Sequence, residues 1–338
     1  MNGSACHPSL QYVERGEGNT SQMAQTHATY PPPRRFHNRP RLPLALSAQT
    51  IIMTDLTQVL ASGILMGLVY ALISLGLTLI WGVVEIVNFA HGDFLMLAMY
   101  LAFTIYALFH LDPLLSLPLV VIALAVFGVI VHKFIIRPVL KAPMLAQIFV
   151  TFGLMIFLRG MAQFIWGPDY KAIPDPLVSG SLQIGGVYLS LPQLVAGVGS
   201  VLGAALIAWI VYRTELGRGL RAVAEDREAA SLMGIPPERM YIATWALGAG
   251  SLGIAGALLV NFFYVFPEVG SVFGLLAFVT VALGGFGSVA GAFIAGIIIG
   301  LVQMSAGFFI NPAIKDIPVY LIYLVVVVLR PQGLLGEF

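Results

Sequence analysis

The sequence predicts an all-α fold: a polytopic transmembrane helix bundle of about eight to ten membrane segments, some broken or re-entrant. Three observations lead to this prediction. Of the 338 residues, 59% are hydrophobic and 10% are charged, whereas soluble domains carry roughly 25% charged residues. Apolar runs long enough to cross a bilayer alternate with short polar stretches. These runs are continuously apolar, which excludes a β-barrel with its alternating strands.

The amino-terminal residues 1–52 differ from the rest of the chain. They are rich in proline and arginine and lack an apolar period, so they are predicted to be a disordered tail. Met53 lies just before the first apolar block and resembles a natural translation start. The tail is therefore expected to be either dispensable or an over-extended gene start. The tail holds the one cysteine, Cys6, and the sequence predicts no disulfide, metal site or cofactor. Residues 53–338 form the predicted membrane domain.

Eight apolar blocks follow, and each is a candidate helix. They cover residues 57–81, 92–110, 114–133, 144–166, 191–212, 241–264, 271–308 and 317–330. A spanning helix needs about 20 apolar residues. The block 271–308 is therefore too long for one crossing, and we expect it to enter the membrane and return to the same side.

Basic residues in short loops predict the orientation, because such loops stay in the cytoplasm. The loops 133–141 and 213–239 carry lysines and arginines and are predicted to be cytoplasmic. The loop 167–190 leans acidic and is predicted to lie outside, while Arg330 places the carboxyl terminus inside. Counting crossings puts the amino terminus outside, whereas the arginines of the tail favour the inside. A re-entrant stretch near 82–92 would reconcile the two.

The first interrupted block reads WGVVEIVNFAHGDFLM. Charged groups at membrane depth cost about 2.5–3.5 kcal/mol each on insertion scales, so they persist where they face a cavity, a partner or the interface. The residues predicted to line a translocation path here are Glu85, Asn88, His91, Gly92 and Asp93. An interfacial turn outside any path is the alternative.

The second interrupted block reads VALGGFGSVAG. Glycines free the backbone to leave the helix, and transporters place solute sites at such unwound segments near the bilayer midplane. Gly284, Gly285, Gly287 and Ser288 are predicted to form such a break. The alternative is close helix packing, which is our interpretation of the glycine pairs at 63 and 67, 199 and 203, and 296 and 300.

Arg159, Gln163 and Trp166 end the fourth block near its predicted outer surface. Arginine and tryptophan at such positions typically extend to the interface and anchor the helix there. We expect these three residues to have this anchoring role rather than to bind a ligand.

The segment 214–240 reads TELGRGLRAVAEDREAASLMGIPPERM and is the longest charged stretch outside the tail. It predicts one amphipathic helix over residues 218–233, ended by Gly234 and the prolines that follow. An isolated short helix is unstable and needs a surface on which to dock. The alternative is a loop that only solvates two helix ends.

The pattern Glu228–Ala229–Ala230–x3–Gly234 resembles the coupling-loop signature of ABC importer permeases, although the usual downstream Ile-x-Leu-Pro is absent. The segments VNFAHGDFLML, AEDREAASLMGI, LGGFGSVAGA and PQGLLG come in order along the chain. With them the chain resembles the permease family of branched-chain amino acid ABC importers over nearly all of residues 53–338. The resemblance implies that small alanines seat in a groove of an ATPase subunit. The coupling-loop residues that it implies are Arg221, Glu225, Asp226, Glu228, Ala229, Ala230 and Gly234.

This resemblance implies a permease subunit of an ATP-driven importer for branched-chain amino acids or related small polar solutes. The implied location is the bacterial inner membrane. The implied partners are a sister permease, two ATPase subunits, a periplasmic substrate-binding protein and membrane lipid, but no nucleic acid.

None of the four lysines follows a glycine, so no phosphate-binding G-x4-G-K-[ST] loop exists in this chain. The chain is therefore expected not to be an enzyme, and a separate subunit is expected to hydrolyse ATP. The alternative function is a secondary transporter or channel for a small solute such as urea or an amide. Glu85 and Asp93 would then be the candidate ion-coupling residues.

Overall fold

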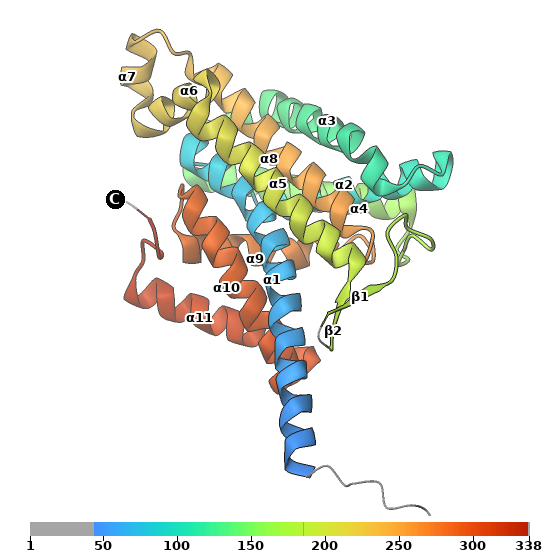
Figure 1. Cartoon of the computed structure of the whole chain (residues 1–338). Coiled ribbons are helices and arrows are strands. Elements are labelled where there is room, and N and C mark those ends of the chain that lie inside the picture. Colours follow the sequence, from blue (N-terminus) through green and yellow to red (C-terminus); the bar gives the residue numbers. More distant parts are fainter. Residues whose placement is uncertain (1–43, 185, 337–338) are drawn as a thin grey trace, which may run out of the picture. The chain divides into compact units, whose positions relative to one another are not determined.

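The computed structural model describes residues 44–184 and 186–336, and within them helices dominate (Figure 1). The long helices are α1 (Leu44–Val84), α2 (His91–Phe109), α3 (Pro113–Val131), α4 (Met144–Trp166), α5 (Leu191–Arg213), α8 (Pro237–Leu259), α9 (Val269–Gly284), α10 (Val289–Phe309) and α11 (Ile317–Leu329). The shorter elements are α6 (Glu215–Glu225), α7 (Arg227–Leu232), the strands β1 (Ser181–Ile184) and β2 (Val187–Ser190), a π-helical turn (His132–Ile136) and two 3-10 turns (Arg137–Val139 and Pro312–Ile314). Among the described residues, eight helical segments are long and apolar enough to cross a membrane, and α9 is a shorter apolar helix. The predicted polytopic helix bundle is confirmed.

The helices follow the expected blocks closely, with one expected division and two differences. Helix α1 begins at Leu44, so part of the predicted disordered tail is helical, while the prediction for residues 1–43 lies outside the described residues. The block 271–308 divides into α9 and α10, as its length required. The loop 167–190 contains the antiparallel hairpin β1–β2, which the sequence analysis did not predict.

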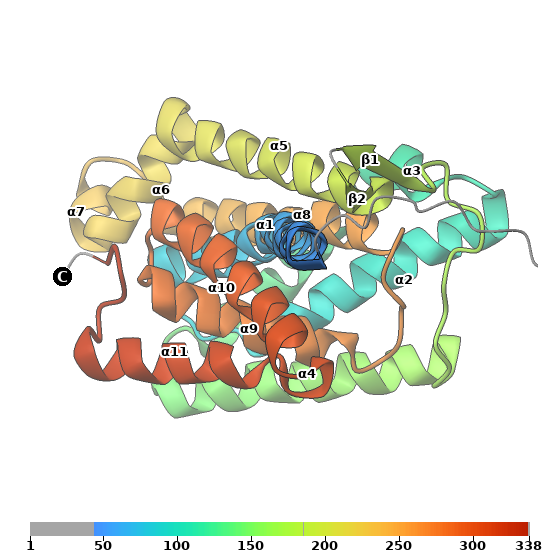
Figure 2. The same ribbon diagram turned by 60° about the horizontal axis from the view of Figure 1, so that its bottom comes forward.

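Helix α1 is the central element of the bundle and is seen nearly end-on among the other helices in Figure 2. Its membrane-spanning window is 83% buried, compared with 6% for the last span, which includes α11. Glycines allow its close approach to α10: a Cβ atom on Gly67 would lie 2.7 Å from the Cα atom of Ile297. The glycine pairs on α1 and α10 therefore serve packing, as predicted.

One end of the bundle, here called the hairpin end, carries β1 and β2. The Gln58 side chain, within α1, donates a hydrogen bond to the carbonyl of Tyr188 at 2.5 Å and so ties α1 to β2. The backbone N–H of Leu177 donates to Asp112 at 2.7 Å, which ties the same loop to the start of α3. The loop 167–190, predicted to lie outside, thus gathers at this end.

The opposite end, here called the coupling end, carries α6 and α7. Arg137 lies 3.1 Å from Glu238 in an ion pair that joins the end of α3 to the start of α8. Both basic loops predicted to be cytoplasmic therefore meet at this end. Charge placement in the sequence and helix direction in the structure agree.

A re-entrant stretch follows α1, as predicted near residues 82–92. Helix α1 ends at Val84, Glu85 adopts a φ of 58°, and the chain then turns back along α1. The Nε2 atom of His91, at the start of α2, lies 2.9 Å from the carbonyl oxygen of Ile73. Ile73 precedes the end of α1 by about 16 Å at the helical rise of 1.5 Å per residue. Helix α2 thus begins inside the bundle rather than at its surface.

Candidate functional site

The coupling end is built on two short helices instead of the single helix predicted for residues 218–233. Thr214 caps α6 by accepting from the N–H of Gly217 at 3.1 Å. Asp226 leaves the helical conformation, with φ −154° and ψ 107°, and accepts from the N–H groups of Glu228 and Ala229 at 2.8 and 3.0 Å. The prediction of one helix is wrong because this carboxylate competes for backbone donors and starts a new helix.

The predicted stop at Gly234 is confirmed, and its geometry is specific. Gly234 has a φ of 83°. Its N–H donates to Ser231 and the N–H of Ile235 donates to Ala230, both at 3.0 Å. This is a Schellman motif, in which the left-handed residue is usually glycine. An added Cβ would meet no atom within 4 Å, so conformation rather than space requires glycine here.

The surface of α7 differs from what the resemblance implied. Ala230 is 5% exposed and packs within its own chain, so this alanine does not face a partner. Ala229 and Glu228 are exposed. The apolar side chains of Leu232 and Met233 are 89% and 82% exposed. Sequence reasoning missed these two residues, although two large apolar residues ending a charged helix could have indicated a docking surface.

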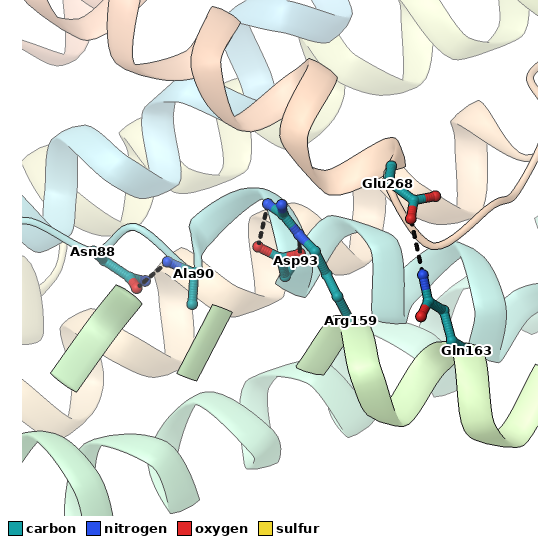
Figure 3. A network of polar contacts seen from close by, with 6 residues as sticks. All are labelled: Asn88, Ala90, Asp93, Arg159, Gln163 and Glu268. Carbon is teal, nitrogen blue, oxygen red and sulfur yellow. Dashed lines mark hydrogen bonds and ion pairs between the residues drawn. The ribbon is translucent and has the colours of Figure 1, made fainter. Parts of the chain in front are cut away.

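The polar residues at the start of α2 hold the re-entrant chain in place. Asn88, His91 and Asp93 are all fully buried. The Asn88 side chain accepts from the N–H of Ala90 at 3.1 Å, which shapes the turn into α2 (Figure 3). Gly92 lies against α9, where an added Cβ would be 2.7 Å from the Cα of Gly274. Polar side chains and glycine contacts together fix where α2 begins.

Arg159 forms an ion pair with Asp93 and does not extend to the interface as predicted (Figure 3). Its Nε atom lies 2.6 Å from Oδ1, and one terminal nitrogen lies 3.3 Å from Oδ2. An isolated charge is costly inside a membrane, so pairing an acidic with a basic residue is the expected solution. The sequence could have indicated this pair, because α2 and α4 are apolar helices and each carries a single charged residue, Asp93 in α2 and Arg159 in α4.

The neighbours of Arg159 on α4 also make specific contacts. Gln163 donates to Glu268, just before α9, at 2.9 Å (Figure 3). The indole N–H of Trp166 donates to Thr104 at 2.8 Å, and its ring stacks on Tyr100 with centroids 4.6 Å apart. Helix α4 is thus attached to α2 and to the α8–α9 connection.

The second glycine-rich break lies at the coupling end, not near the midplane as predicted. Gly285 and Gly287 adopt φ values of 104° and 81° in the turn between α9 and α10. Helix α9 has 16 residues, or about 24 Å at 1.5 Å per residue. Because this length nearly crosses the apolar core, the glycines join two helices at a surface instead of interrupting one. The hydroxyl of Ser288 then caps α10 by accepting from the N–H of Gly291 at 3.1 Å.

The carboxyl-terminal PQGLLG segment closes this turn. The N–H groups of Leu334 and Leu335 donate to the carbonyls of Leu283 and Gly284 at 2.8 and 3.0 Å. These bonds satisfy acceptors that the end of α9 would otherwise leave free. Two sequence motifs that lie far apart along the chain therefore form one structural unit.

A pocket of about 490 Å³ opens at the coupling end. It is lined by residues from two predicted sites, the coupling loop and the second glycine-rich break. Arg221 and Glu225 line it from α6, and Gly287 and Ser288 line it from the α9–α10 turn. Its other lining residues are Thr78, Leu79, Gly82, Val83, Val211, Tyr212, Leu220, Ala224, Phe286, Val289 and Leu335.

The predicted path residues at the start of α2 lie farther from the coupling end of α1 than the pocket does. His91 is beside Ile73, whereas Gly82 approaches Gly287, and these two points on α1 are about 13 Å apart by the helical rise. The predicted path residues therefore form two groups instead of one site. Among the described residues no group of His, Cys, Asp and Glu side chains could hold a metal ion.

Comparison with known proteins identifies the family. Residues 59–328 match the family model described as the permease component of branched-chain amino acid transport systems. The chain is 30% identical to the high-affinity branched-chain amino acid transport system permease protein BraD of Pseudomonas aeruginosa, covering 83% of this chain and 95% of that protein. It is 29% identical to LivH of Escherichia coli over the same shares, and 28% identical to a probable LivH of Methanocaldococcus jannaschii, covering 78% and 85%. No solved structure matches significantly. This chain is a multi-pass membrane protein that belongs to the branched-chain amino acid transport system permease family.

Proposed function

We propose that this permease component serves an ATP-driven importer of the bacterial inner membrane that carries branched-chain amino acids or related small polar solutes. The solute is inferred from the names of the relatives. The proposed assembly contains a sister permease, two ATPase subunits and a periplasmic substrate-binding protein. ATP is hydrolysed by the ATPase subunits, since this chain carries no phosphate-binding loop.

The observation that supports the coupling proposal is the capped helix α7 with its exposed apolar end. Glu228, Ala229, Leu232 and Met233 form the proposed contact with the ATPase subunit, since all four are exposed. Large exposed apolar groups on a fixed element are typical of a protein interface. Asp226 and Gly234 serve the contact indirectly, because they set the two ends of α7.

Ala230 has a different proposed role from its neighbours. It is buried, and its carbonyl accepts from Ile235. A push on α7 would therefore be passed to the main bundle through this packed face. ATP can drive the bundle between two states only if the closed ATPase dimer binds one state more tightly. The α7 contact is where this difference in affinity would arise.

The residues at the start of α2 have a supporting role in the proposed path. Asn88, His91 and Gly92 hold the re-entrant chain, and Asp93 fixes α2 to α4 through Arg159. Glu85 is exposed at the turn with a left-handed backbone conformation. We propose that this set shapes the wall of the path, whereas Gly287 and Ser288 line its mouth at the coupling end.

Co-purification tests the coupling proposal. The double variant Leu232→Asp/Met233→Asp is expected to lose the ATPase subunits and ATP-dependent uptake while it remains folded in the membrane, because two charges would be placed in an apolar contact. The matched control is Ile184→Asp, which changes a side chain that is 58% exposed at the hairpin end. Retention of the ATPase by the double variant would contradict the assignment of α7. Uptake without ATP or ATPase would instead favour a secondary transporter or channel.

A further inference from the structure

His132 is a buried titratable residue at the coupling end that the proposed function does not use. Its side chain is 0% exposed, and neither ring nitrogen has a hydrogen-bond partner among the described residues. The Nε2 atom lies 3.5 Å from Oε1 of Glu238, which is longer than a hydrogen bond but within the range of an ion pair. That oxygen is itself buried and makes no hydrogen bond. Since buried polar groups normally have a partner, the contact between these two residues is incomplete in this conformation.

A π-helical turn directs two basic side chains toward Glu238. The turn covers His132–Ile136, and the N–H of Arg137 donates to the carbonyl of His132 across it. Residues five apart point to different sides of an α-helix, which has about 3.6 residues per turn, whereas a π turn is bonded from residue i to residue i+5. His132 and Arg137 therefore both reach Oε1 of Glu238, at 3.5 and 3.1 Å. Turns of this kind are frequent at functional sites.

The two basic side chains differ in what they can do. Arg137 is always charged, and because its side chain is 56% exposed it can exchange Glu238 for water at little cost. His132 is fully buried, and histidine is the side chain that ordinarily changes its charge between about pH 5 and pH 8. Glu238 lies in the first turn of α8, where the helix dipole favours a carboxylate. Among these three residues, only His132 can therefore switch the contact with pH.

Glu238 and Arg137 are the charged groups that face the His132 ring in the described part of the chain. Helix α8 also presents the rings of Tyr241 and Trp245, whose centroids lie 6.3 and 6.1 Å from that of His132. The remaining charged residues of the elements packed around the ring are the exposed Lys133 and Arg239 and, in α4, Arg159, which pairs with Asp93. Protonation of His132 would therefore be read by Glu238.

This contact lies directly after the coupling helix. Helix α7 ends at Leu232 and α8 begins at Pro237, so a movement of α7 reaches the start of α8 through residues 233–236. We propose that the His132–Glu238 contact, here called the latch, is operated by a proton. When His132 is protonated, its ring closes onto Glu238 and holds the start of α8 against the end of α3. When His132 is neutral, the start of α8 is released.

Closing the latch opposes the movement of α7. A charged N–H donor and a carboxylate form a hydrogen bond of about 2.7–2.9 Å, so protonation shortens the 3.5 Å contact. This favours the conformation that the structure shows, and the change that ATP drives becomes slower. Glu238 is 36% exposed, and screening by water limits the effect to about threefold. The effect on transport rests on the proposed function, whereas the closing of the latch does not.

The first test observes the latch in the full-length chain, labelled with 5-fluorotryptophan and placed in nanodiscs. The ring of Trp245 lies beside that of His132, and its ¹⁹F resonance is assigned with the variant Trp245→Phe. We expect this resonance to follow one titration curve between about pH 8 and pH 5, and to stay constant in His132→Gln. The matched control is His110→Gln, which removes an exposed histidine before α3 and should leave the curve unchanged.

The second test measures the ATPase rate of the complete transporter with its binding protein and leucine. The rate of the wild type is divided by that of His132→Gln, so that the effects of pH on the other subunits cancel. We expect a ratio near one at about pH 7.5 and near one third at about pH 5.5. Glu238→Gln is expected to remove this difference, because a neutral amide offers no charge to the protonated ring. Since Glu238 is partly exposed, this variant also covers the case in which His132→Gln does not fold.

Three results would overturn the proposal. A Trp245 resonance that does not change with pH would show that His132 stays in one charge state. A titration curve that persists in His132→Gln would assign the proton to another group. A ratio near one at both pH values, while Trp245 titrates, would show that the latch does not control coupling. An ATPase rate that leucine never stimulates would instead count against the proposed function, and the titration of the chain alone would still decide whether the latch exists.

Discussion

Replacing Arg159 with methionine leaves the Asp93 carboxylate buried without its cation. The Asp93 side chain is 0% exposed and that of Arg159 is 23% exposed, so the pair is largely out of contact with solvent. Removing one partner of a buried ion pair costs about 3–5 kcal/mol, because the other charge stays buried and uncompensated. The variant Arg159→Met is therefore expected to lower the free energy of unfolding by about this amount.

Asp93→Asn is expected to cost less, about 1–3 kcal/mol, because the partly exposed guanidinium keeps access to water. Once Asp93 is neutral, removing Arg159 costs little, so the double variant is expected to lie near Asp93→Asn. The two substitutions should then show a coupling energy of about 3–5 kcal/mol. If the loss of unfolding free energy in the double variant equals the sum of the two single losses, Asp93 and Arg159 do not interact directly.

The assay is unfolding of the purified chain in mixed micelles of mild detergent and dodecyl sulfate, followed by circular dichroism. The matched control is Gln163→Met on the same helix, whose hydrogen bond to Glu268 is exposed. This control is expected to cost less than about 1 kcal/mol. If Arg159→Met costs no more than Gln163→Met, the arginine serves as an interfacial anchor and the account of the α2–α4 contact is wrong.

Three further predictions concern packing and turns. Gly67→Val brings a side chain against the backbone of α10 and is expected to destabilise the bundle by about 1–3 kcal/mol, whereas Gly153→Val, where nothing lies within 4 Å, should leave thermal stability unchanged. Gly234→Val forces a β-branched residue to a φ of 83° and is expected to lower the coupled ATPase rate at normal expression, while Gly234→Asn should retain more activity because asparagine tolerates this conformation. Truncation after Arg330 removes the donors that cap α9 and is expected to lower the melting temperature, and an unchanged melting temperature would show that the cap is dispensable.

The helix bundle could be predicted because the bilayer imposes a simple rule on the sequence. Continuous apolar runs must be helices, and basic loops mark one side. The block 271–308 had to divide because of its length alone. The stop at Gly234 could also be predicted, since glycine followed by prolines has few alternatives at a helix end.

Other features depend on contacts between segments that are distant along the chain. The pairing of Asp93 with Arg159 requires α2 and α4 to be neighbours, and the capping of α9 by Leu334 and Leu335 requires knowledge of where the carboxyl terminus lies. The division between α6 and α7 is set locally by Asp226, which caps α7. The apolar period did not indicate it, because aspartate is compatible with either a helix interior or a helix cap.

Reconstitution tests the central claim most directly, that ATP-driven work reaches this permease through α7. Vesicles are prepared with the chain, its sister permease, the ATPase subunits and the binding protein, and radiolabelled leucine accumulation is measured with and without ATP. We expect accumulation that needs both ATP and the ATPase subunits and that the double variant Leu232→Asp/Met233→Asp abolishes. Accumulation by this chain alone, without nucleotide, would contradict it.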